Sequence, residues 1–335
     1  MEIGMRIVML GHTGVGKTTY VASLYGVMQQ SIEGFRLKAV KPEDHKRWVE
    51  MAEGIQQGEY PMPTDQRQEY NFYLRYEGRN ILEFTWADYR GGAIRETQDT
   101  EQAKALLQDL KAADGIMLFC DCNALASGDI RSNQIGRMTA LASQALLELD
   151  RPVSLAIILT KTDLIENFSA ELLNSLNGLI MAINASEFVL GALIPIVCGT
   201  KLRNVSMPLL FALHTTVVFH AATSYAAAES YADRAKSYET LSKGLTGAVD
   251  WIVSKINNES TYKEMAAKEK KQAATKQREF KEIYEPAMSL YSYVQKLPLI
   301  KSDLALSDYA RILSEGSSEV LKDSVKSLDP FSIFN

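Results

Sequence analysis

The chain has 335 residues, of which 46% are hydrophobic and 23% are charged, as in an ordinary folded protein. Its 36 basic and 41 acidic residues give a formal charge of −5, which argues against a general nucleic-acid binder. No apolar run approaches the roughly 20 residues that span a bilayer, and the N-terminus lacks a signal-peptide pattern. With three scattered cysteines, these features predict a cytoplasmic protein with reduced thiols and no membrane association.

The first 200 residues alternate short β-rich runs with helical patterns, which indicates an α/β sheet. Strands are expected at 5–10, 70–76, 81–86, 115–121, 153–159 and 193–198. Helices are expected at 17–30, 43–57, 101–112, 132–149 and 169–186. The runs 115–121 and 153–159 are apolar throughout, as in parallel strands that are buried on both faces. The sequence Glu77-Gly78-Arg79-Asn80 predicts an antiparallel hairpin turn between the second and third strands.

After residue 204 the strand patterns stop. Residues 207–256 have helical composition, with a break expected at Gly244 and Gly247. Residues 263–282 carry seven basic and four acidic side chains, which is consistent with a solvated helix or with a mobile connector. Pro286 is expected to interrupt the chain before a helical pattern over 287–297. This organisation predicts one domain over residues 1–232 and a helical extension over 233–335.

The segment GHTGVGKT fits the pattern G-x-x-x-x-G-K-[ST], with Gly11, Gly16, Lys17 and Thr18 at its fixed positions. Glycines let successive backbone N–H groups curl inward around an anion, and the following helix adds its positive N-terminus. Lys17 is expected to reach the β- and γ-phosphates, and the Thr18 hydroxyl to bind Mg²⁺. A plain glycine-rich turn is the alternative, but the preceding strand and following helix favour a phosphate loop. The residues expected around the phosphates are Gly11, His12, Thr13, Gly14, Val15, Gly16, Lys17, Thr18 and Thr19.

Two further signals follow predicted strands. Asp88 could hold Mg²⁺ through water, and Gly91 could offer its N–H to the γ-phosphate, although D-x-x-G also describes a simple Asp-initiated turn. In Thr160-Lys161-Thr162-Asp163, the Asp163 carboxylate can accept both the N1–H and the N2–H₂ of guanine, which adenine lacks. The stem of Lys161 would pack along the base. Asp163 could instead cap the next helix.

With these three signals in this order, residues 5 to about 230 resemble the Ras-like and translation-factor-related P-loop GTPases. The resemblance implies a three-layer α/β/α P-loop NTPase fold with a mostly parallel six-stranded sheet, one antiparallel edge strand and a C-terminal helical extension. It also implies GTP or GDP with Mg²⁺ as cofactors. The extra helix 43–57, the phosphate loop and the sequence Asp88-Tyr89-Arg90-Gly91-Gly92 look most like predicted bacterial double-GTPase-type domains.

The resemblance assigns roles to several residues. The base motif begins with Thr160, where the family usually has Asn, and Cys198-Gly199-Thr200 matches the loop whose backbone touches the guanine oxygen. Thr64 is the best match for the switch threonine that completes Mg²⁺ coordination and senses the γ-phosphate. The implied metal ligands are Thr18, Thr64 and Asp88. The implied catalytic residues are Lys17, Thr64 and Gly91.

Ras-type enzymes carry a water-orienting glutamine directly after the D-x-x-G glycine, and here that position is Gly92. Arg90 or Arg95 could act as a cation on the developing phosphate charge or remain a solvated surface charge. We therefore expect a GTP-binding switch with slow, Mg-dependent hydrolysis and a protein effector or activator. The alternatives are an interaction scaffold that holds nucleotide without useful turnover and an ATPase, which the T-K-x-D signal opposes. The sequence leaves the oligomeric state open.

Overall fold

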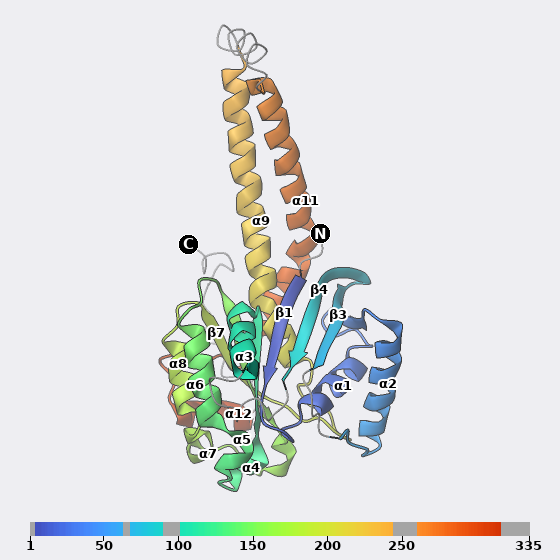
Figure 1. The fold of residues 1–335 in the computed structure, drawn as a ribbon, viewed down its shortest axis with the longest axis vertical. Helices are drawn as coiled ribbons and strands as arrows, with labels where there is room; N and C mark the ends of the chain where they lie inside the picture. The colour runs from blue at the N-terminus through green and yellow to red at the C-terminus, as the bar shows by residue number, and fades with distance from the viewer. Residues whose placement is uncertain (1–3, 63–67, 90–100, 244–259, 316–335) are drawn as a thin grey trace. The chain divides into compact units, whose positions relative to one another are not determined.

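The computed structural model describes residues 4–62, 68–89, 101–243 and 260–315. Its centre is a seven-stranded sheet in the order β2-β3-β4-β1-β5-β6-β7 (Figure 1). Strands β4, β1, β5, β6 and β7 run parallel, whereas β3 is antiparallel to both β2 and β4. The strands are β1 Gly4–Leu10, β2 Phe35–Ala39, β3 Gln68–Tyr76, β4 Arg79–Asp88, β5 Gly115–Asp121, β6 Val153–Thr160 and β7 Val189–Pro195.

The α/β class and the mostly parallel sheet are confirmed, but the expectation of six strands with an antiparallel strand at the edge is wrong. The additional strand β2 pairs with β3 and lies outside it. Only five residues long, β2 alternates buried and exposed side chains, so its pattern is too short to stand out from a loop. The β3–β4 hairpin forms as expected, because Glu77 and Gly78 both take positive φ, as a two-residue turn requires.

Helices cover both faces of the sheet. Helices α1 and α2 pack together over the β2–β4 side, while α3, α6 and α8 lie on the opposite face (Figure 1). The helices of the first 206 residues are α1 Lys17–Val27, α2 Pro42–Gln56, α3 Glu101–Ala112, α4 Cys122–Ala126, α5 Ile130–Asn133, α6 Ile135–Leu146, α7 Ala170–Asn174 and α8 Asn177–Asn184, with a 3₁₀ turn, η2, at Thr162–Leu164. The single helix expected over 169–186 is therefore two shorter ones.

Alternation along the strands builds two apolar layers. Val8 and Leu10 of β1 contribute to a buried cluster with residues of α3, α6 and α8. On the other face, Trp48 of α2 packs edge-on against Tyr70, their ring centroids 4.8 Å apart, which places α2 on the strands. Because both faces are covered, the central strands are buried along their length, as their apolar sequences require.

The described chain separates into two compact units. One, the sheet unit, runs up to Thr216 and resumes at Ser289; the other, the helix-pair unit, spans Val217–Met288. Helices α9 (Met207–Leu241) and α11 (Tyr262–Val294) each run through both. The domain boundary expected at residue 232 stays a prediction, since α9 passes that position without a break.

Within the helix-pair unit, α9 and α11 lie side by side and antiparallel (Figure 1). Tyr225 of α9 packs on Phe280 of α11, and Arg234 of α9 forms an ion pair with Glu269. Because α11 contains the whole basic stretch 263–282, this stretch is helical, as one of the two expectations had it. Pro286, expected to interrupt the chain, lies inside α11 instead, where it removes one backbone donor without ending the helix.

By length and composition alone, helix α9 is apolar enough to cross a membrane. It is the one such helix in the described ranges, and 61% of its most apolar stretch is buried inside the protein. Its first turns pack on the sheet: a Cβ added at Gly115 of β5 would lie 2.7 Å from the carbonyl oxygen of Ala212. A buried core helix can have the same length and composition, so these two properties do not establish a membrane span.

Residues 289–315 return to the sheet unit. The Leu193 N–H donates to the Pro298 carbonyl, and the Ile300 N–H donates to the Gly191 carbonyl, so this segment follows the exposed edge of β7. Helix α12 (Leu306–Glu315) then packs on α7. The segment covers an edge strand that would otherwise present unpaired backbone groups.

Candidate functional site

The phosphate loop connects β1 to α1 at the carboxyl edge of the parallel strands. Gly14 and Gly16 have φ values of 85° and 95°, a conformation that favours glycine. Gly11 is required for a different reason, because a Cβ there would lie 2.9 Å from the Cβ of Phe119. The loop therefore curls tightly against β5, and α1 begins at Lys17 directly after it, so the positive N-terminus of the helix lies at the loop.

Lys17 and Asp88 form the charged centre of the site. The Lys17 Nζ donates to the Gly11 carbonyl oxygen over 2.8 Å and lies 3.9 Å from the Asp88 Oδ1. Both side chains are buried. Burial lowers the pKa of Lys17 against the opposing effect of Asp88, and burial raises the pKa of Asp88 to about 6 although Lys17 lowers it. The pair places one cation and one carboxylate at the loop.

The Asp88 carboxylate has an unusual environment. Neither of its oxygens accepts a hydrogen bond from any residue in the described part of the chain. A buried carboxylate without donors is costly unless a bound group supplies them. A hydrated Mg²⁺ supplies both positive charge and O–H donors, so the residue present here fits that ion. Among the described residues no group of three or more His, Cys, Asp or Glu side chains gathers as a metal cluster.

Thr160 ties the phosphate loop to the base-recognition segment. Its Oγ1 lies 2.8 Å from the Val15 carbonyl oxygen and 3.1 Å from that of Cys120. One hydroxyl therefore links β5, the end of β6 and the phosphate loop. A threonine at this position makes a cross-loop contact through its hydroxyl.

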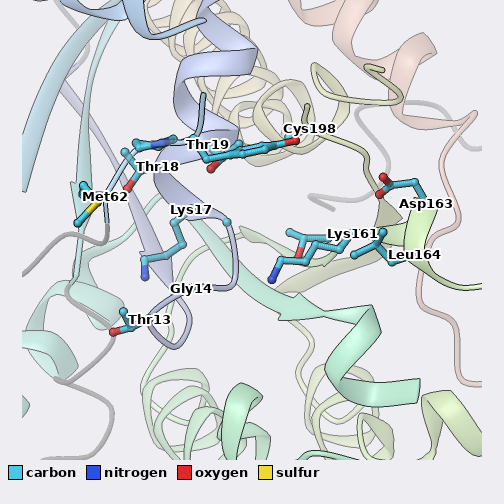
Figure 2. A pocket seen from close by; sticks show the side chains of 14 residues that line it. Thr13, Gly14, Lys17, Thr18, Thr19, Met62, Lys161, Asp163, Leu164 and Cys198 are labelled. Atoms are coloured by element: carbon cyan, nitrogen blue, oxygen red, sulfur yellow. The ribbon is translucent and has the colours of Figure 1, made fainter. Parts of the chain in front are cut away.

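A cavity of about 460 Å³ joins the two segments. In Figure 2, Asp163 and Cys198 lie on one side of this cavity and Thr13 and Met62 on the other, with Lys161 between them. Asp163 is exposed in the 3₁₀ turn η2, and Lys161 precedes that turn with a φ of 55°. The cavity therefore extends from the phosphate loop to the segment expected to read the base.

The predicted site residues divide into three groups. Those lining the cavity are Thr13, Gly14, Gly16, Lys17, Thr18, Thr19, Thr160, Lys161, Asp163 and Cys198. Those that do not line it are Gly11, His12, Val15, Asp88, Gly199 and Thr200. Thr64, Arg90, Gly91, Gly92 and Arg95 lie outside the described residues, so their predicted roles stay predictions.

The sequence did not predict one wall of the cavity, which contains a single aromatic residue among the described ones, Tyr60. Tyr60, Pro61 and Met62, which follow α2, line the cavity together with Leu164. A Cβ added at Gly199 would lie 2.8 Å from the Tyr60 hydroxyl oxygen, so Tyr60 reaches the loop that begins at Cys198. The signal in the sequence was an aromatic residue directly before the proline turn that leads to Thr64.

Two polar residues, Asp121 and Asn133, were also missed. Asp121 ends β5, and one of its carboxylate oxygens, Oδ2, accepts from the Lys161 ammonium over 2.5 Å. Asn133 is fully buried and hydrogen-bonds to the backbone of Asp121. Neither residue belongs to a recognisable local motif, because their contacts join segments that are far apart in the sequence.

A search of curated proteins gave no match to the chain. The model of the family Double-GTPase 2 matches residues 6–189, which is more than half of the chain. The matched range contains the phosphate loop, Asp88, Lys161 and Asp163. The family's name places guanine-nucleotide binding and GTPase-like activity with this domain. The chain therefore belongs to the Double-GTPase 2 family and carries a P-loop GTPase-like domain of the double-GTPase type.

Proposed function

We propose that this protein is a GTP-binding molecular switch that hydrolyses GTP slowly to GDP and phosphate, depends on Mg²⁺ and signals to a protein partner. The observation that carries the proposal is that Lys17, which lies beside the Asp88 carboxylate, and Asp163 line the same cavity. A triphosphate needs a cation and backbone donors at one end of its site, and guanine needs an acceptor at the other.

At the phosphate end, the roles follow from charge and geometry. The Lys17 ammonium, already held toward the loop by the Gly11 carbonyl, is positioned to exchange that acceptor for phosphate oxygens. Thr18, with Asp88 and Thr64, would hold Mg²⁺. When bound, this ion neutralises charge that develops on the transferred phosphoryl group. Gly91 would donate its N–H to the γ-phosphate.

At the base end, Asp163 would select guanine. Its carboxylate can accept from two adjacent donors on guanine, whereas adenine would leave it facing an acceptor and without a partner. The Lys161 stem and Tyr60 offer apolar surface for the ring faces. Cys198, Gly199 and Thr200 would approach the guanine oxygen through their backbone.

Slow turnover follows from Gly92, which stands where Ras-type enzymes carry the glutamine that orients the attacking water. Without that side chain, positioning of the water would depend on a partner or on Arg90 or Arg95. The same residue favours a second candidate function, an interaction scaffold that keeps nucleotide bound as a structural cofactor with little turnover.

The test separates these functions. Nucleotide is extracted from protein purified without added nucleotide and identified by chromatography, and phosphate release is then measured with GTP or ATP, with and without Mg²⁺. Bound GDP with slow, Mg-dependent GTP turnover supports the switch. Unhydrolysed GTP supports the scaffold, and bound adenine nucleotide contradicts the guanine assignment. Lys17→Met is the matched negative control, since it keeps the apolar stem and removes the ammonium.

A further inference from the structure

We propose that Asp121 is a positioning residue for guanine recognition, holding the ammonium of Lys161 so that the stem of that lysine is ordered before the base arrives. The inference rests on the proposed function, because it deepens the role of Lys161 at the base end of the cavity. Asp121 itself does not line the cavity; it acts through Lys161.

Asp121 is rigidly held. It is the last residue of β5 and also the N-cap of α4, where its Oδ1 accepts from the backbone N–H groups of Asn123 and Ala124 at 2.9 and 3.2 Å. Asn133 fixes the backbone on both sides: its Oδ1 accepts from the Asp121 N–H at 2.6 Å, and its Nδ2 donates to the Asp121 carbonyl at 3.0 Å. The carboxylate therefore has little freedom to follow a moving lysine.

Lys161 depends on that fixed carboxylate. Its backbone is set by a φ of 55°, and the preceding Thr160 is anchored to Val15 and Cys120. The Lys161 side chain has four rotatable bonds and is 38% exposed. Without a partner it would therefore sample many rotamers. The Asp121 side chain is only 10% exposed. Its Oδ2 accepts a hydrogen bond from the Lys161 Nζ and so restricts the lysine to fewer rotamers. Ordering the stem beforehand removes part of the entropic cost of binding the base.

The two oxygens of Asp121 make the role testable, because they have separate partners. Oδ1 serves the helix cap and Oδ2 serves Lys161. Asp121→Asn can keep an acceptor at Oδ1 while placing an NH₂ donor against the lysine ammonium. Asp121→Ser keeps a capping acceptor and has no charge, so it serves as a second variant if the asparagine form does not fold.

The experiment measures dissociation of fluorescently labelled GDP from the full chain. Asp121→Asn and Asp121→Ser are expected to bind GDP about tenfold more weakly, mainly through faster dissociation. The matched control is Asp129→Asn, since Asp129 accepts from the Ser132 N–H near the start of α5 as Asp121 accepts from the first turn of α4. This control should bind GDP as the wild type does.

A double-mutant cycle separates positioning from general structural support. In a Lys161→Met background, Asp121→Asn should change GDP affinity less than about twofold, because its target is already absent. A further tenfold loss in that background would show that Asp121 only supports the fold and would overturn the inference. Unchanged affinity of Asp121→Asn in the wild-type background would also overturn it and leave the proposed function intact. If the wild type binds no guanine nucleotide, the proposed function and this inference fall together.

Discussion

The Lys17 Nζ lies 3.9 Å from the Oδ1 of Asp88, and neither oxygen of that carboxylate accepts a hydrogen bond from the described residues. The two charges come from different elements, the start of α1 and the end of β4, and parallel pairing of β1 with β4 brings them together. A buried charged pair whose carboxylate accepts no hydrogen bonds is better suited to binding than to stability, since a buried carboxylate without hydrogen-bond donors costs free energy.

Asp88 should govern the dependence of nucleotide retention on Mg²⁺. In Asp88→Asn, the Mg²⁺ concentration that half-maximally slows GDP release should rise roughly 10- to 100-fold, as for loss of a carboxylate that orients a metal's water. The measurement is GDP dissociation across a Mg²⁺ titration. Glu83→Gln, on the same strand, is the control and should follow the wild type; an unchanged titration of Asp88→Asn would remove Asp88 from the metal site.

Thr160 should support both stability and binding. Thr160→Val keeps the shape but leaves the buried Val15 and Cys120 carbonyls without this donor, so the free energy of unfolding should fall by about 1–3 kcal/mol. Urea denaturation measures the change. Thr160→Ser retains the hydroxyl and should lie much closer to the wild type. Equal loss in both variants would mean that the methyl group, not the hydroxyl, carries the effect.

The close approach of Tyr60 to Gly199 should restrict which side chains position 199 tolerates at the base end of the cavity. Gly199→Ala would place a Cβ 2.8 Å from the Tyr60 hydroxyl oxygen, so Tyr60 must move and GDP affinity should fall several-fold, on the order of 1 kcal/mol. Adding Tyr60→Phe removes the clashing oxygen and should restore much of the affinity. Gly136→Ala, where an added Cβ meets nothing within 4 Å, is the control. Failure of the double variant to recover would place the cause elsewhere.

His214 should make the fold sensitive to acid. It is fully buried, both its ring nitrogens lack hydrogen bonds among the described residues, and it stacks on Tyr291. Burial alone lowers its pKa from 6.5 to about 4. Between these values the unfolded chain binds a proton that the folded chain does not, so this group lowers the free energy of unfolding as pH falls below 6.5.

The expected loss from His214 is about 2 kcal/mol at pH 5 relative to pH 7.5. Urea denaturation of the wild type and of His214→Phe at both pH values measures it, since phenylalanine keeps a ring against Tyr291 and cannot titrate. The wild type should lose more stability than the variant. The same pH dependence in both proteins would contradict the assignment to His214.

Much of the fold was predictable because its elements carry strong local patterns. The apolar strands β5 and β6 and the glycine-rich loop after β1 follow from sequence. The strand β7 was placed at 193–198 but spans Val189–Pro195, because buried Ile196 and Val197 belong to a loop as apolar as a strand. Pro286 was expected to interrupt the chain but lies inside α11, because a long helix can accommodate one missing hydrogen bond.

The candidate site was predictable where a fixed spacing encodes the chemistry, as in Lys17 and Asp163. It was not predictable where a residue acts through a tertiary contact. Asp121 looks in sequence like the end of an apolar strand, and only the pairing of β5 with β6 brings it beside Lys161. Tyr60 lies in the loop after α2, and its approach to Gly199 depends on how that helix packs on the sheet.

Competition binding with GDP, ADP and xanthosine diphosphate tests whether one cavity holds the phosphates at Lys17 and guanine at Asp163. The wild type should prefer GDP. Asp163→Asn exchanges a pair of acceptors for one acceptor and one donor, so it should lose GDP affinity and gain affinity for the xanthine nucleotide. If Asp163→Asn keeps the wild-type order of affinities, Asp163 does not read the base and the cavity is not a guanine-nucleotide site of the kind proposed.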